Sequence, residues 1–402
     1  MLFKRFLSSF KEYNQSILKS NQKEIMMLIL ILLNQLKSIK ASGLREKYLK
    51  RIYRFFDKVD DQILESIQAI YQRLAFEIFL KWYQMSPSYR RKHPIIISVD
   101  DSVIEKFGKH MEGLKKLKSS DGRFVRGYSL LAITIAIGSG ASIPIRLIWH
   151  NANDKQSKIQ LAYLFLRDWL GKLKNTYQLD EKELIVAFDS WYLSSEMVEV
   201  LNDLKVSWIS KMKKNWRITA IVSQNSYPVR QLGIWKDYLK VVNIKVIEFF
   251  YRALKPNKVF SIWHKSISLC YATQTTTEKG KAILVSNTNF KHKSFIKYYR
   301  LRWKIEVFFK EMKQVLLVEF THFTSLVKNL FLMDLKFLVY TILQMIKYES
   351  RKYKSYTTRQ LLQEIWAELN RLTPNSHNSL EYLQLHIINK SQNPFEALYS
   401  KA

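Results

Sequence analysis

The order of apolar segments between residues 94 and 212 constrains the fold more than any other feature of the chain. Residues 94–99 (PIIISV) and 183–188 (ELIVAF) have the length and composition of buried strands. Two strands joined at Gly138 to Gly140 follow the first run, and an amphipathic helix precedes the second. A further helix and a fifth strand complete the segment. This succession predicts an α/β core with a mixed five-stranded sheet.

The segments that flank the core differ from it in pattern. The N-terminal segment has apolar residues at helical spacing, and the segment between Lys213 and Phe290 has short alternating strands rich in Tyr, Trp and Lys. The C-terminal part reads as helices. We therefore expect five parts: 1–90, an N-terminal helical domain for DNA binding or packing; 91–213, the first part of the core; 214–290, a β-rich insertion; 291–348, the rest of the core; and 349–402, a helical tail.

The net charge indicates a polyanionic partner. Lys and Arg total 65 against 34 acidic residues, a formal charge of +31, and the basic residues are spread along the whole chain. Apolar residues make up 47% of the sequence, which excludes global disorder. No basic amphipathic helix with lipid-anchor signals is evident, so nucleic acid is preferred over a membrane surface.

The remaining sequence signals indicate a cytoplasmic protein without a membrane span. Cys270 is the single cysteine, which excludes intrachain disulfides and cysteine-rich zinc modules. The N-terminus lacks the pattern of a signal peptide, and the apolar run at 26–33 is too short to cross a bilayer.

Carboxylates follow the predicted strands at the positions where functional groups gather in α/β sheets. Asp100 and Asp101 follow the first strand, and Asp189 follows the fourth. Glu306 lies on a helix packed across them in the predicted fold. Two aspartates and a glutamate would supply the hard oxygen ligands for two Mg²⁺ ions about 3.5 to 4 Å apart.

Each of these residues also has a structural explanation. Asp100 and Asp101 could cap a turn, and Asp189 could cap the following helix. Glu306 could form an ion pair with Arg302, four residues before it. Only their joint placement indicates a catalytic site.

The helix that holds Glu306 carries a more specific pattern. Tyr299, Arg302, Glu306 and Lys313 fall within about 60° of one another at 100° per residue. Their spacing resembles the Y-x2-R-x3-E-x6-K signature of DDE transposases from bacterial insertion sequences, in the subgroup that moves by cut and paste through DNA hairpins. The blocks VDDSVIEKFGKHMEG and VAFDSWY resemble the two aspartate blocks of these enzymes, and the resemblance covers about residues 94–345.

This resemblance implies a ribonuclease-H-like catalytic core interrupted by a β-rich insertion. It also implies that Asp100, Asp189 and Glu306 bind two Mg²⁺ ions, with Mn²⁺ as a substitute, and catalyse phosphodiester hydrolysis and strand transfer. Asp101 is the alternative first ligand. Because side chains on a strand alternate between faces, only one of the two can face the metals. We choose Asp100, which directly ends the apolar run.

The resemblance further implies the residues that hold DNA. Tyr299 and Arg302 would contact phosphates beside the cleaved end, and Lys313 would hold a phosphate nearby. The family uses an aromatic residue of the β insertion to hold a flipped base, for which three tryptophans are candidates: Trp216, Trp235 and Trp263.

A second candidate DNA-binding stretch comes from the residues themselves. The segment 205–217 (KVSWISKMKKNWR) interleaves cations with tryptophans, a composition suited to a nucleic-acid groove, although a solvated basic edge has the same composition. From it we select Lys211, Lys213 and Lys214 as DNA-binding residues.

The predicted function is that of a DNA transposase. Its partners would be double-stranded DNA, as terminal inverted repeats and target, and a second copy of the chain on that DNA, in the bacterial cytoplasm with the nucleoid. Two alternatives are a ribonuclease-H-like nuclease without strand transfer and a catalytically inactive DNA-binding descendant.

Overall fold

The structure is a computed structural model of the 402-residue chain. It describes residues 2–14, 22–34, 39–108, 110–119, 121–137, 142–150, 154–213, 216–218, 220–222, 244–245, 259–264, 266–277, 280–321, 323–371, 373, 379–383, 388 and 400.

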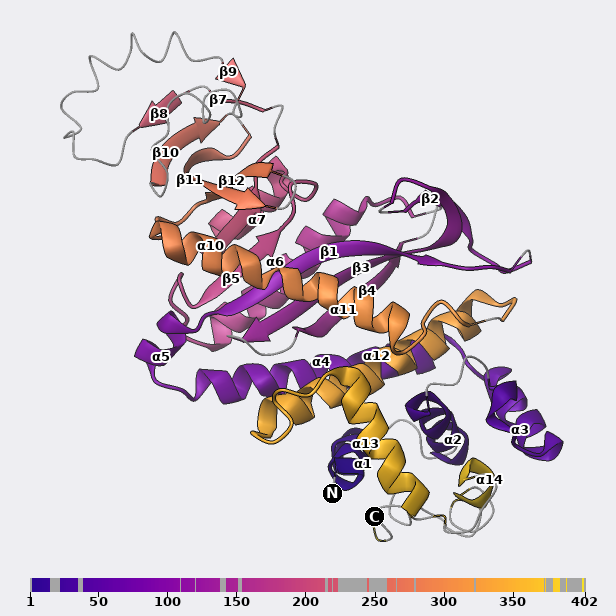
Figure 1. The fold of residues 1–402 in the computed structure, drawn as a ribbon. Helices are drawn as coiled ribbons and strands as arrows, with labels where there is room; N and C mark the ends of the chain where they lie inside the picture. The colour runs from indigo at the N-terminus through magenta and orange to yellow at the C-terminus, as the bar shows by residue number, and fades with distance from the viewer. Residues whose placement is uncertain are drawn as a thin grey trace.

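Five strands form the centre of the main sheet (Figure 1). In the order in which they lie side by side they are β4 (Ser142–His150), β3 (Phe124–Ile137), β1 (Ile95–Glu105), β5 (Leu184–Phe188) and β6 (Ser207–Lys211). β3 is antiparallel to β4 and β1, whereas β1, β5 and β6 run parallel. This mixed sheet confirms the expected α/β class and the ribonuclease-H-like core.

The first strand extends further than the sequence pattern predicts. The apolar run ends at Val99, but β1 continues to Glu105 because β3 pairs with it as far as Gly127. A Cβ atom on Gly127 would lie 2.3 Å from the carbonyl oxygen of Ile104, so this close approach requires glycine. The expectation that the strand stops before the aspartates is therefore wrong: Asp100 and Asp101 lie inside β1.

The predicted β-rich insertion does contain strands, and they extend the core sheet. β12 (Gly280–Ser286) pairs with β6, and β11 (Ser268–Thr277), β10 (Val259–His264) and β8 (Ala220–Val222) follow in order. Two short strands, β7 (Arg217–Ile218) and β9 (Ile244–Lys245), pair separately. At the other edge, β2 (Lys115–Lys118) pairs with β3. The continuity of the insertion with the core through β12 and β6 is not evident from the sequence.

Helices cover both faces of the central sheet. α6 (Lys158–Thr176) and α7 (Ser195–Asp203) pack together, and α6 begins with a capping box formed by Ser157. α10 (His292–Leu301) and α11 (Trp303–Gln314) run across β5, β1, β3 and β4 (Figure 1).

A layer of helices from both ends of the chain lies beside the sheet (Figure 1). Its centre is α12 (Leu326–Glu349), which contacts α4 (Asp61–Tyr83) along its length and is buried from Phe331 to Ile346. Around these two lie α1 (Leu2–Asn14), α2 (Gln22–Leu33), the 3-10 helix η2 (Lys40–Ser42), α3 (Glu46–Phe56), α5 (Pro87–Lys92), α13 (Thr358–Arg371) and α14 (Ser379–Leu383).

Contacts between the two ends of the chain join this layer. The backbone N–H groups of Leu2 and Phe3 donate to the carboxylate of Glu368, and α1 packs on α13 and α12. The N-terminal segment is helical as predicted, but it shares its core with C-terminal helices. In the described part of the chain, no helix combines the length and apolar character needed to cross a membrane.

Candidate active site

The register of two neighbouring strands brings Asp100 and Asp189 to the same level of the sheet. Val99 of β1 is paired with Phe188, the last residue of β5. The residues that follow them are Asp100 and Asp189. β5 ends there, and the carboxylate of Asp189 accepts a hydrogen bond from the backbone N–H of Ser190 at 2.6 Å. The prediction that Asp189 follows directly on a buried strand is confirmed.

Glu306 lies on α11, whose position is fixed by its apolar face. Ile305, Phe308 and Met312 are fully buried against the sheet and α12. Arg302 has helical backbone angles, so α10 and α11 follow one another with little interruption. The apolar stripe therefore turns the polar stripe, with Tyr299, Arg302 and Glu306, toward β1.

Two buried lysines hold the segment that follows α11. Lys106, just beyond β1, donates to the carbonyl oxygens of Val318 at 2.7 Å and Glu319 at 3.2 Å. Lys336 of α12 donates to the carbonyl of Leu317 at 2.6 Å. These bonds tie the C-terminal end of α11 to β1 and α12, and so help to keep Glu306 in place.

Arg302 lies between a carboxylate of the strand β1 and a carboxylate of the helix α11. Its Nη1 donates to Oδ2 of Asp100 at 3.0 Å, and its Nη2 donates to Oε1 of Glu306. Its guanidinium carbon lies 5.4 Å from the centre of the Tyr299 ring. The i, i+4 ion pair considered as a structural explanation for Glu306 is present, and the same guanidinium also reaches Asp100, far away in the sequence.

The surroundings of these groups favour a bound cation. Burial raises the pKa of Asp100 to about 7, with smaller contributions from Asp101 and Glu306, while Arg302 opposes the rise. Burial also raises the pKa of Tyr299 to about 12. A buried carboxylate close to other carboxylates is stabilised by positive charge, which Arg302 supplies in this structure.

Asp101 faces the opposite side of the sheet. Its Oδ1 accepts a hydrogen bond from the hydroxyl of Tyr192 at 2.8 Å, and its Oδ2 pairs with Lys158 at the start of α6. The alternation of side chains along β1 thus separates Asp100 from Asp101. Neither Tyr192 nor Lys158 was predicted to belong to the site, because no local pattern in the sequence links them to Asp101.

The carboxylates have the right chemistry for Mg²⁺, which prefers oxygen ligands. Within the described ranges, however, no group of three or more His, Cys, Asp or Glu side chains is arranged to hold a metal ion. Asp100 and Glu306 are joined through Arg302 instead. The donor set fits the metal in composition, and a metal between these carboxylates would require Arg302 to move.

The other predicted DNA-binding lysines lie apart from this centre. Lys313 belongs to α11, the helix that holds Glu306, and its Nζ lies 3.8 Å from Oε1 of Glu319. Lys211 and Lys213 lie at the end of β6, two strands from β1, and Lys213 is 5.3 Å from the centre of the Trp216 ring. Lys214 lies outside the described residues.

The three candidate base-holding tryptophans have different outcomes. Trp216 stacks on His264, with ring centres 4.1 Å apart. Trp263 belongs to β10, but its side chain is outside the described part, and Trp235 is outside it altogether.

Two exposed tryptophans that were not among the predicted site residues are close in the sequence to residues that were. Trp191 is 64% exposed and lies two positions after Asp189; Trp303 is 58% exposed and follows Arg302. Large exposed aromatic side chains at a site expected to bind DNA suit base stacking. The block VAFDSWY and the segment 302–304 (RWK) contained this signal, because each has a tryptophan within two positions of a selected residue.

Comparison with known protein families gives a match to the core of the chain. The family profile described as the transposase DDE domain matches residues 91–342, more than half of the 402-residue chain. The match extends from the residues before β1 into α12 and contains Asp100, Asp189 and Glu306. No curated protein gives a significant match.

Proposed function

Because the chain belongs to the family of proteins with a transposase DDE domain, we propose that it is a DNA transposase of the cut-and-paste type. It hydrolyses a phosphodiester at each element end to free a 3′-hydroxyl, forms and reopens a DNA hairpin, and joins the ends to target DNA. The partner is double-stranded DNA, to which a chain with a formal charge of +31 is attracted. Because two ends must be held together, the active form is a dimer on DNA.

One observation supports this proposal most strongly. Asp100 and Glu306, selected from separate parts of the sequence, lie within reach of one guanidinium, and the register of β1 and β5 places Asp189 next to Asp100 along the sheet. These three carboxylates are the proposed ligands of two Mg²⁺ ions, for which Mn²⁺ can substitute. Bound there, the ions would activate a water or a 3′-hydroxyl and stabilise the leaving oxygen.

The remaining residues of the site position DNA. Arg302 has the planar fork that binds two phosphate oxygens at once, and it would exchange its carboxylate partners for a phosphate when cations enter. Tyr299, which lies against Arg302, would contact the neighbouring phosphate. Lys313 lies further along the same helix and would hold the strand beyond.

Substitution of Glu306 tests the proposal. In the Glu306→Gln variant we expect Mg²⁺-dependent cleavage of element-end DNA to fall by at least 10³-fold, while DNA affinity changes by less than about threefold, since the carboxylate binds cations and not phosphates. Glu196→Gln is the matched control, because Glu196 is exposed on α7. Unchanged cleavage by Glu306→Gln, or Mg²⁺-independent cleavage by the wild type, would exclude this site.

Two alternatives predict different products. A ribonuclease-H-like nuclease would release fragments but would not join a pre-cut end with a free 3′-hydroxyl to a plasmid. An inactive descendant would bind DNA without cleaving it. Incubating pre-cut ends with supercoiled plasmid and Mg²⁺ separates the three, since only a transposase yields joined molecules.

A further inference from the structure

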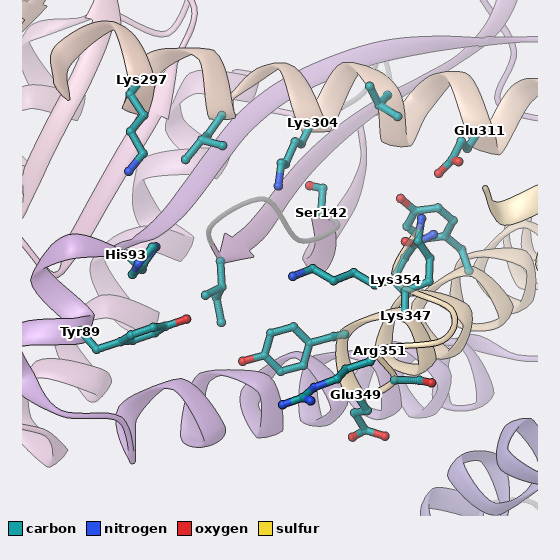
Figure 2. A pocket seen from close by; sticks show the side chains of 17 residues that line it. Tyr89, His93, Ser142, Lys297, Lys304, Glu311, Lys347, Glu349, Arg351 and Lys354 are labelled. Atoms are coloured by element: carbon teal, nitrogen blue, oxygen red, sulfur yellow. The ribbon is translucent and has the colours of Figure 1, made fainter. Parts of the chain in front are cut away.

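A large basic cavity lies beside α10 and α11, away from the carboxylates. Its volume is about 870 Å³. Its walls come from α10 and α11, from Tyr89 and His93 in and after α5, and from the end of α12 with the turn that follows it (Figure 2). Residues Ile137 and Ser142, at the ends of β3 and β4, close it on the side of the sheet.

Cations dominate the lining of this cavity. Five described side chains that line it are Lys or Arg: Lys297, Lys304, Lys347, Arg351 and Lys354. They come from three separate segments, and Lys354 extends into the space below Lys304 (Figure 2). No ion pair joins Lys297, Lys347, Arg351 or Lys354 to a carboxylate of the described residues.

The two carboxylates in the lining already have partners. Glu349 forms an ion pair with Lys81, and Glu311 accepts a hydrogen bond from the hydroxyl of Thr358 at 2.8 Å. The charge of Glu311 also acts on Lys347 and opposes the lowering of its pKa. Five cations against two carboxylates still leave the cavity with an excess of positive charge available to an anion.

The cations are also close together and partly desolvated. Burial, together with the nearby charge of Lys347, lowers the pKa of Lys304 to about 8. Burial likewise lowers the pKa of Lys347. Cations that repel one another at a poorly hydrated surface are stabilised by an anion placed between them.

This cavity is separate from the candidate active site. At about 100° per residue, the stripe with Lys297, Lys304 and Glu311 is centred about 170° around the helix from the stripe with Arg302 and Glu306. The helix that holds the catalytic glutamate thus presents a second polar stripe, on the other flank of its buried face. A DNA segment in the cavity therefore lies on a different flank of this helix from the DNA segment bound at the carboxylates.

The size of the cavity selects the form of DNA that can enter it. A cube of this volume would be about 10 Å on a side, too small to enclose a B-DNA duplex, whose major groove alone is about 12 Å wide. A duplex does not fit inside the cavity, whereas a few nucleotides of a single strand do. The wall also offers aromatic surfaces: Tyr89 is 43% exposed and lies 4.5 Å from His93 between ring centres.

We propose that this cavity binds a short single-stranded DNA segment that extends from the duplex held at the active site. The backbone phosphates contact Lys347, Lys354 and Arg351, and a base stacks on Tyr89. The combination of converging cations with an exposed aromatic is the usual means of binding single strands without sequence preference. The assignment rests on the proposed function, because it presupposes that the protein acts on DNA.

The test compares two DNA substrates and two charge-matched variants. Lys347→Gln/Lys354→Gln removes two cavity charges, and Lys172→Gln/Lys182→Gln removes two exposed charges on and after α6. Fluorescence anisotropy measures their affinity for a blunt duplex and for the same duplex with a five-nucleotide overhang. We expect the cavity variant to lose about tenfold in overhang binding at 0.15 M salt, with a salt slope reduced by about 1.4, and to lose less than threefold on the blunt duplex. The control variant should weaken both substrates equally.

A second measurement does not depend on the lysines. A 2-aminopurine base in the overhang should be quenched by the wild type and by Tyr89→Phe, but not by Tyr89→Ala. Equal losses of the cavity variant on both substrates, or quenching unaffected by Tyr89→Ala, would overturn the cavity assignment. A wild type that binds and cleaves blunt DNA but gains nothing from an overhang refutes only this inference. A wild type that binds no DNA refutes the proposed function as well.

Discussion

Substitutions at the two adjacent aspartates of β1 should have opposite consequences. Asp100→Asn removes a carboxylate that faces Arg302 and Glu306, whereas Asp101→Asn removes one that faces Tyr192 and Lys158. We expect Asp100→Asn to reduce Mg²⁺-dependent cleavage by at least 10³-fold. Asp101→Asn should retain cleavage within about threefold of the wild type.

The cost of Asp101→Asn should appear in stability. The Tyr192 hydroxyl donates to Asp101 at 2.8 Å, and hydrogen bonds to charged groups contribute about 1.5 to 3 kcal/mol. The ion pair with Lys158 is about one quarter exposed on both sides and adds at most about 1 kcal/mol. Asparagine keeps an oxygen that can accept from Tyr192, so we expect the free energy of unfolding to fall by about 1 to 3 kcal/mol.

Urea unfolding and cleavage of element-end DNA, measured on both variants and the wild type, check this prediction. Asp100→Asn should unfold within about 1 kcal/mol of the wild type or be more stable, because it relieves a buried carboxylate whose pKa is raised. If a folded Asp101→Asn protein were inactive while Asp100→Asn cleaved DNA, the assignment of faces in β1 would be refuted.

Two further predictions concern binding and pH. If six or more phosphates are neutralised, DNA affinity should fall by about 10³-fold or more between 50 and 200 mM salt; a flat response in a filter-binding titration would argue against DNA as the main partner. Burial raises the pKa of Asp334, which accepts from Gln68, from 3.8 to about 7. The folded state therefore holds a proton that the unfolded state has lost, and Asp334 should lower the free energy of unfolding by about 1.4 kcal/mol per pH unit between about 4 and 7. Asp100, whose pKa is also raised to about 7, adds a similar slope. Urea midpoints should show the combined slope in the wild type and a weaker one in Asp334→Asn; equal slopes would mean that Asp334 is ionised in the folded protein.

The helices and strands of the core were largely predictable because their signals are local. The apolar run before Asp189 matches β5, and the C-terminal part, which reads as helices, contains α12, α13 and α14. The stripe of Tyr299, Arg302 and Glu306 follows from helical periodicity alone, and these residues do lie together. Such patterns need only the backbone geometry of one element.

Where an element ends depended on its neighbours. β1 continues through Asp100 and Asp101 because β3 supplies hydrogen bonds after the apolar run has stopped. The insertion strands join the core sheet because β12 pairs with β6, a contact between segments more than seventy residues apart. Strand pairing of this kind is decided by hydrogen bonds between distant segments, which single-sequence patterns do not contain.

The amino-acid sequence by itself determined the class of the fold, the positive charge and the carboxylates that could hold metal ions. Only the tertiary structure decided that Asp100 faces Glu306, that Asp101 faces Tyr192, and that Arg302 stands between two of the acids. It also gathered the cations of the cavity from α10, α11 and the end of α12. The reason is physical: periodicity orients side chains within one element, whereas the distances between elements follow from strand register and core packing.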